Sequence, residues 1–176
     1  RWNGHGVYLG HYCLMLCCYR LAGGDAKYAE HQQQIAEVLR QGFRSQRSGA
    51  WVPSYPHRAW AFDCLPCLLA VRLTDVQEGR NLNASGKLVA DHLRFRQTVA
   101  MDQATGFACT EMDPRTGRPL AGARGCAIAG SICFLGHLAP AHCRDLYARF
   151  KEGYWIEQGE GSGKIAGFRE WPRAHD

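Results

Sequence analysis

Apolar and polar positions alternate along the chain with the period of an α-helix. Between residues 7 and 21 apolar side chains recur every three or four positions, and the run stops at Gly23-Gly24, a pair typical of a helix C-terminus. The next segment, 25–43, carries a narrower apolar stripe on an otherwise polar cylinder that includes three successive glutamines. This succession predicts an apolar inner helix followed by an amphipathic outer helix, which together form a helical hairpin.

The same succession occurs twice more along the sequence. Residues 63–73 are almost wholly apolar, whereas 85–98 carry apolar side chains on one side only. Residues 124–138 are rich in small side chains, which permit close helix approach, and an outer helix is expected to begin near Pro140. The pattern therefore predicts an all-α fold of about three helical hairpins, as found in toroids and solenoids, here with one β-hairpin insertion.

Two long connections separate the predicted hairpins, and such connections often carry function. The first, 44–62, is rich in aromatic residues. The second, 101–123, contains the turn sequence Asp113-Pro114-Arg115-Thr116-Gly117, which predicts a β-hairpin with Phe107, Cys109 and Glu111 on one strand face. The tail, 153–176, is rich in glycine and tryptophan, and we expect it to be irregular.

The composition is that of one globular domain spanning 1–176, with 46% hydrophobic residues. A net charge of +5 is spread along the chain without a block of like charges, so no nucleic-acid partner is expected. No apolar run reaches the length of a membrane span. The nine cysteines are an odd number, which favours free thiols over a disulfide scaffold. Six lie in apolar helical stretches and are predicted to be buried: Cys13, Cys17, Cys18, Cys64, Cys67 and Cys133.

The first predicted hairpin contains Val7-Tyr8-Leu9-Gly10-His11, and the motif continues through residues 14–28 with a Gly-rich turn. It resembles the hairpin that carries the active-site histidine in the linalool dehydratase-isomerase family, and His11 falls on that histidine. A looser similarity follows at Gly106-Phe107, at Asp113-Pro114 and at residues 140–151. The family folds as a ring of six hairpins, so we expect this chain to correspond to its middle part. The resemblance implies helical hairpins of an (α/α)6-type toroid and cofactor-free dehydration or isomerisation of a terpene alcohol.

Three features depart from the family pattern. The family uses cysteine thiols in the connection that here runs from Trp51 to Phe62, and this segment contains no cysteine. A family methionine one turn before the histidine is replaced by Val7, and an active-site tyrosine near the start of the third inner helix is replaced by Cys126. These departures argue against the same reaction, while the fold and the location of the site remain in common.

His11 and Asp63 are the first candidate catalytic residues. A neutral imidazole donates one proton and accepts another, as a step that expels hydroxyl and removes a neighbouring proton requires. The alternative for His11 is a core histidine bonded to a backbone carbonyl. Asp63 precedes an apolar helix with Pro66 three positions later, which predicts an N-cap. A capping carboxylate facing the cavity of a toroid also serves as an acid or base.

Cys126 and Glu111 are the other two catalytic candidates. Cys126 lies where a helix begins, and the helix dipole there lowers a thiol pKa, although a small buried filler is the alternative. Glu111 shares a strand face with Cys109, and a solvated charge is its alternative. Candidate substrate-binding residues would wall an apolar pocket, with ordinary packing as the alternative. They are Val7, Tyr8, Trp51, Tyr55, His57, Trp60 and Cys109.

We expect no metal and no cofactor. Cys64-Leu65-Pro66-Cys67 has the spacing of a thioredoxin motif without its βαβ setting. Cys13, Cys17 and His5 lie within helical reach of one another, but no further motif completes four zinc ligands.

The leading hypothesis is an acid/base lyase or isomerase acting on a small apolar alcohol or alkene. Two alternatives stay open. One is a carbohydrate-active toroid in which two carboxylates, Asp63 and Glu111, act on a sugar. The other is a non-catalytic toroid fragment whose open hairpin edges bind a partner or form a homo-oligomer.

Overall fold

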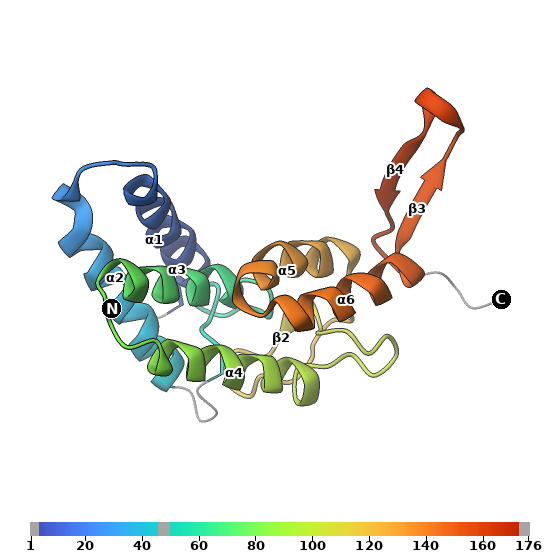
Figure 1. Cartoon of the computed structure of the whole chain (residues 1–176). Coiled ribbons are helices and arrows are strands. Elements are labelled where there is room, and N and C mark those ends of the chain that lie inside the picture. Colours follow the sequence, from blue (N-terminus) through green and yellow to red (C-terminus); the bar gives the residue numbers. More distant parts are fainter. Residues whose placement is uncertain (1–3, 46–49, 173–176) are drawn as a thin grey trace.

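The computed structural model describes residues 4–45 and 50–172, and this part of the chain holds six α-helices (Figure 1). Each predicted helix is present, and its first and last residues differ by a few positions from those predicted by the apolar pattern. The helices are α1 (Gly6–Leu21), α2 (Ala29–Ser45), α3 (Cys64–Gln77), α4 (Asn83–Thr98), α5 (Gly125–Leu138) and α6 (Pro140–Gly153). A short 3-10 helix, η1 (Ala26–Tyr28), precedes α2, and the Asp25 side chain caps it by accepting a hydrogen bond from the Lys27 backbone N–H.

The six helices form three successive hairpins, α1–α2, α3–α4 and α5–α6 (Figure 1). The first members of the hairpins pack in series, so that α3 lies between α1 and α5. This position explains the almost unbroken apolar sequence of α3, which is buried over most of its length. Gly10 permits the closest approach of α1 to α3, because a Cβ there would lie 2.6 Å from Cys67 Sγ and 3.0 Å from its backbone nitrogen.

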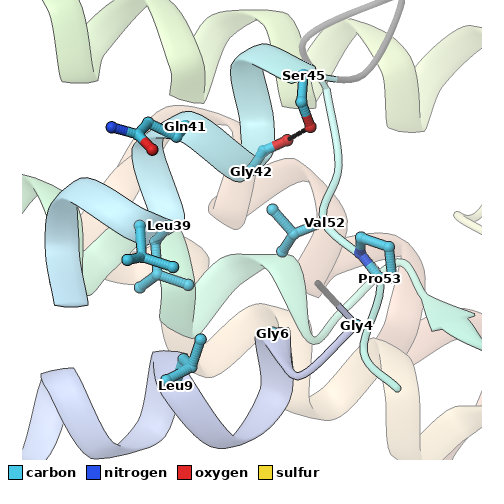
Figure 2. A pocket seen from close by; sticks show the side chains of 10 residues that line it. Gly4, Gly6, Leu9, Leu39, Gln41, Gly42, Ser45, Val52 and Pro53 are labelled. Carbon is cyan, nitrogen blue, oxygen red and sulfur yellow. Dashed lines mark hydrogen bonds between the residues drawn. The ribbon is translucent and has the colours of Figure 1, made fainter. Parts of the chain in front are cut away.

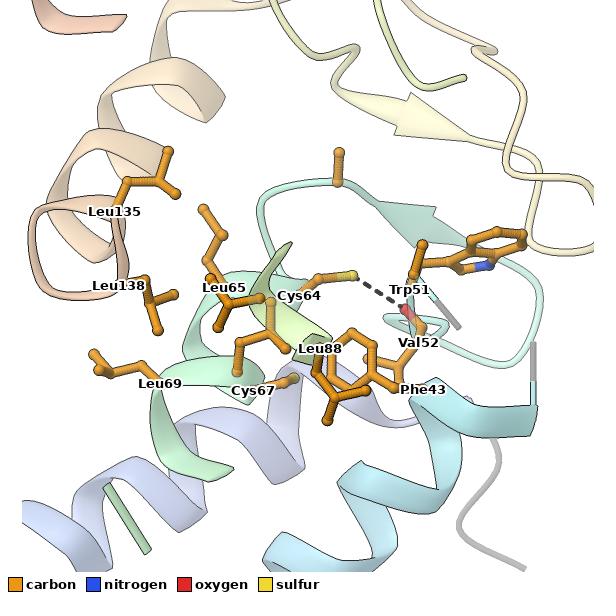
Figure 3. Close-up of a cluster of buried hydrophobic side chains, with 14 of the residues drawn as sticks. Phe43, Trp51, Val52, Cys64, Leu65, Cys67, Leu69, Leu88, Leu135 and Leu138 are labelled. Carbon is orange, nitrogen blue, oxygen red and sulfur yellow. Dashed lines mark hydrogen bonds between the residues drawn. The ribbon is translucent and has the colours of Figure 1, made fainter. Parts of the chain in front are cut away.

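The core is centred on α3 and gathers side chains from all three hairpins and from the first connection (Figure 3). Of the six cysteines predicted to be buried, four are: Cys13, Cys17, Cys64 and Cys67. The prediction is wrong for Cys18, which shares the exposed face of α1 with Met15, and for Cys133, which shares the exposed face of α5 with Cys126 and His137. All nine cysteines are free. No helix in the described ranges is long and apolar enough to cross a membrane.

The β-hairpin predicted at 101–123 is present around its turn, where Met112 and Pro119 form an antiparallel bridge, but the segment also pairs outside itself. The segment does turn back at Asp113, whose carboxylate accepts hydrogen bonds from two backbone N–H groups at 2.8 Å, and it contains isolated bridges. Its strand β2 (Glu111–Met112), however, pairs with β1 (Ala59–Trp60) of the first connection, antiparallel. The two long connections are therefore joined to each other, which the local turn sequence could not show.

The tail predicted to be irregular also differs in the structure. Strands β3 (Trp155–Gln158) and β4 (Ile165–Phe168) form an antiparallel hairpin that projects away from the helices (Figure 1). Its base is anchored by Phe168, whose ring lies 5.6 Å from that of Phe150 on α6. Glycines with positive φ at 159 and 161 bend the chain between the strands, where residues with a Cβ are strained. The last four predicted tail residues, 173–176, lie outside the described residues.

Candidate active site

The exposed side of α1 and the first connection enclose a shallow apolar depression of about 490 Å3. Four predicted site residues line it: Val7, Tyr8, His11 and Tyr55. Tyr12 and Met15 complete the lining, and sequence reasoning did not assign them a role. Helical spacing would have found both, since Tyr12 follows Tyr8 by four residues and Met15 follows His11 by four.

His11 is the titratable histidine in this lining. Its Nδ1 lies 2.8 Å from the carbonyl oxygen of Val7, so Nδ1 carries the proton and donates it to that carbonyl. The neutral ring then presents Nε2 as a proton acceptor. The ring of Phe134, from α5, meets the imidazole edge-on at 6.1 Å between centroids. The alternative of a core histidine is correct in one respect, since His11 is hydrogen-bonded to a backbone carbonyl. Its side chain is exposed, however, and does not belong to the core.

Asp63 is buried at the predicted N-cap position of α3, but its side chain does not cap the helix. Its φ of −64° and ψ of −19° are helical, and its carboxylate makes no capping hydrogen bond. A turn immediately precedes α3, in which the Asp63 N–H donates a hydrogen bond to the Trp60 carbonyl. Burial raises the pKa of the Asp63 carboxyl, while a hydrogen bond with Ser54 and the positive charge of protonated His11 lower it. Asp63 and His11 are thus electrostatically linked.

Three predicted aromatic or imidazole wall residues do not line the depression. Trp51 is buried and stacks on Phe95 with 4.8 Å between ring centroids, so it belongs to the core. Trp60 packs against Tyr55, which lines the depression, with 5.2 Å between the ring centroids in an edge-on arrangement. His57 is exposed and lies outside the lining.

Cys109 and Glu111 are engaged elsewhere. The Cys109 side chain is buried, and burial raises its pKa to about 11. Glu111 forms an ion pair with Arg58 at 2.6 Å on the joined connections. Neither residue lines the depression.

Cys126 contradicts the expectation of a thiol activated by a helix N-terminus. Glu170 of the tail occupies that position, with its carboxylate 3.0 Å from the Cys126 backbone nitrogen and 3.2 Å from Sγ. Burial and this carboxylate raise the pKa of Cys126 instead of lowering it. The chain separation of 44 residues explains why no local signal revealed the contact.

A second cavity, of about 520 Å3, lies on the opposite side of α1 (Figure 2). It is lined by Gly6, Leu9, Leu39, Val52 and neighbouring residues of α1, α2 and the first connection. None of the predicted site residues lines it, and its polar side chains are those of Gln41 and Ser45. This lining offers no acid or base for chemistry, which leaves the His11 depression as the better candidate.

Within residues 4–45 and 50–172, no group of three or more His, Cys, Asp or Glu side chains is placed to hold a metal ion. The thiols of the Cys64–Cys67 motif are buried in α3, and burial raises the pKa of Cys64 to about 12 and that of Cys67 well above its usual value. Such thiols lack the thiolate character of a redox pair.

The chain was compared with models of protein families and with curated proteins, and nothing matches it in either comparison. The similarity to the linalool dehydratase-isomerase family therefore remains a prediction from the first hairpin.

Proposed function

We propose that the chain is part of a linalool dehydratase-isomerase-like α/α toroid and performs cofactor-independent acid/base chemistry on a small apolar alcohol or alkene. The observation that carries the proposal is the His11 tautomer in an apolar depression. The Val7 carbonyl fixes the proton on Nδ1, which leaves Nε2 as the base toward a bound substrate.

The depression suits an apolar substrate with one hydroxyl group. The aromatic rings of Tyr8, Tyr12 and Tyr55 and the thioether of Met15 offer contact area without a fixed charge. His11 contributes the imidazole of this lining, which carries a positive charge when it is protonated and none when it is neutral. A terpenoid-sized alcohol places its hydroxyl near His11 and its hydrocarbon part on the rings.

In the proposed dehydration, protonated His11 donates its Nε2 proton to the substrate hydroxyl, the C–O bond breaks and water leaves. Nε2 then removes a proton from the neighbouring carbon, which forms the alkene and restores the protonated imidazole. The carboxylate of Asp63 acts at a distance as a positioning charge, because it attracts the imidazolium form of His11. The tyrosine ring faces favour the positive charge that develops on the substrate carbon.

The three-hairpin arrangement supports the toroid part of the proposal. The series α1, α3 and α5 would form an arc of the inner ring, with α2, α4 and α6 on its outside. The homo-oligomer predicted from open hairpin edges also stays a proposal. Its support is the exposed apolar surface of α1, where Tyr8 is 66% and Met15 56% exposed.

A carbohydrate-active site is less well supported. That alternative needs Asp63 and Glu111 to act together across a polar cleft. Neither carboxylate lines the depression, and Arg58 neutralises Glu111.

The direct test is turnover of a panel of allylic and terpenoid alcohols, with alkene and isomer products measured by gas chromatography. His11→Ala should lower the rate by about 10²–10⁴-fold, the contribution of a general acid/base. His57→Ala is the matched control, because His57 is exposed and lies outside the depression. Absence of turnover with every alcohol, or equal rates for both variants, would show that the proposal is wrong.

A further inference from the structure

The buried side of α1 carries a pair of thiols that the proposed reaction does not use. Cys13 and Cys17 are one helical turn apart and fully buried where α1, α2 and α3 meet. Both sulfur atoms approach the same hydroxyl, Thr74 Oγ1, at 4.0 and 3.5 Å. The side-chain amide of Gln32 donates to Cys17 Sγ at 3.2 Å. The two sulfurs thus share one polar pocket inside the helical core.

Polar groups around this pair favour a negatively charged sulfur. The hydrogen bond between the two thiols lowers the pKa of Cys17 to about 7, with help from Thr74 and the positive charge of Arg20, although burial opposes the shift. The same hydrogen bond and burial raise the pKa of Cys13. Arg20 also donates to the Gln32 side chain at 3.1 Å, which holds the amide in place.

We propose that Cys13 and Cys17 form a two-coordinate site for a soft monovalent cation of the Cu(I) class. Thiolate sulfur is the preferred ligand of such cations. The binding step is M⁺ + 2 RSH → [RS–M–SR]⁻ + 2 H⁺, in which two S–H bonds break, two M–S bonds form and no oxidation occurs. Arg20, which is also paired with Glu78 at 2.8 Å, contributes a favourable charge near Cys17, and Gln32 acts as the hydrogen-bond donor that orients the sulfur of Cys17.

Helix geometry favours a bridging metal over a disulfide at this pair. Residues four apart on a helix have Cβ atoms about 5–6 Å apart, whereas a disulfide needs about 3.5–4.5 Å. Two M–S bonds of about 2.3 Å, the length seen for Zn–S bonds, separate the sulfurs by up to about 4.6 Å. The helix therefore accommodates a linear S–M–S bridge without unwinding.

Two further observations narrow the class of metal and the choice of thiols. No third His, Cys, Asp or Glu completes the cluster in the described part of the chain, which disfavours four-coordinate zinc. Thiols of both close pairs donate to backbone carbonyls, Cys17 to Ala70 at 3.6 Å and Cys67 to Gly6 at 3.1 Å, so side-chain partners distinguish the two pairs. No side-chain amide donor to the Cys64 and Cys67 sulfurs corresponds to Gln32, and burial raises the pKa of both thiols, whereas one thiol of the proposed pair, Cys17, has a lowered pKa.

The test uses the reduced protein with its exposed and half-buried thiols changed to serine, so that surface binding is removed. The changed positions are Cys18, Cys126, Cys133 and Cys143. Under anaerobic conditions this protein is titrated with Cu(I) against a coloured Cu(I) chelator. We expect one tightly bound equivalent, whose X-ray absorption spectrum shows two sulfur neighbours, and a rise in the unfolding temperature on binding.

Variants assign the site. Cys17→Ser should weaken Cu(I) binding by more than about 100-fold and Gln32→Leu by about 10-fold, whereas the matched buried control Cys67→Ser should leave it unchanged. Circular dichroism checks that each variant is folded. If Cys17→Ser does not fold, Cys13→Ser and the X-ray absorption spectrum of the unmutated pair decide. Unchanged affinity in the Cys17 or Cys13 variant, loss of binding in Cys67→Ser, or a coordination number other than two would overturn the proposal.

Discussion

A buried ion pair between α2 and α3 allows a stability prediction with a clear sign. Arg40 and Asp75 are 5% and 2% exposed, and Arg40 Nη2 donates a hydrogen bond to Asp75 Oδ1 at 2.6 Å. Asp75→Ala leaves the guanidinium buried with Glu37 as its remaining acidic partner, at 2.6 Å. Breaking a buried pair costs about 3–5 kcal/mol, and Glu37 favours the lower end of that range. For a chain of this length the loss corresponds to a fall in Tm of about 6–12 °C.

Thermal unfolding followed by circular dichroism measures this loss, with two comparison variants. Lys87→Ala removes an exposed pair with Asp91, which has a similar distance of 2.5 Å, and should change stability by less than about 1 kcal/mol. The double variant Arg40→Met with Asp75→Leu should recover most of the stability, because apolar side chains avoid the desolvation cost of both charges. The reasoning is refuted if Asp75→Ala costs no more than Lys87→Ala.

Three further predictions concern the helix contact, the tail and the buried carboxyl. Gly10→Ala should lower the free energy of unfolding in urea by about 1–2 kcal/mol, because the cost of the clash between the added methyl group and Cys67 exceeds the gain in helix propensity. An unchanged free energy of unfolding would contradict the close contact of α1 with α3. Glu170→Gln should lower the pKa of Cys126 and speed its alkylation at pH 7, and an unchanged rate would exclude the contact. The pKa of Asp63 is raised in the folded protein, so its contribution to stability is fully present below pH 3.8 and is lost as the pH rises through the folded-state pKa. Asp63→Asn should therefore be more stable than the unmutated protein at neutral pH, and its free energy of urea unfolding should depend less on pH. Parallel pH profiles of the two proteins would contradict this.

The helices could be predicted from the sequence because their signal is local. The apolar period, the glycine pair at 23–24 and Pro140 mark their extents, and the structure places all six helices accordingly. The pairing of Trp60 with Glu111 joins residues 51 positions apart, and no local pattern indicated it. The β3–β4 hairpin was missed because its strands are four residues long and its turn is rich in glycine.

The candidate site could be predicted only in part. Val7 and His11 were named from the resemblance of the first hairpin to the family and Tyr8 as an aromatic wall residue, and helical spacing explains why all three line one depression. Tyr55 reaches the same depression from the first connection, and its aromatic character was the available signal. The state of Asp63 depends on burial beneath residues distant in the sequence. Tertiary contacts, rather than residue type, therefore decide which candidates can act.

The central claim is that the His11 depression binds a small apolar alcohol. Titration of the protein with an acyclic terpene alcohol, followed by NMR of the histidine rings and of the methionine, leucine and valine methyl groups, tests it without requiring turnover. We predict saturable shifts for the His11 ring and the Met15 methyl group, with the His57 ring unaffected. Absence of these shifts, or shifts confined to methyl groups of the opposite cavity such as those of Leu39 and Val52, would contradict the account.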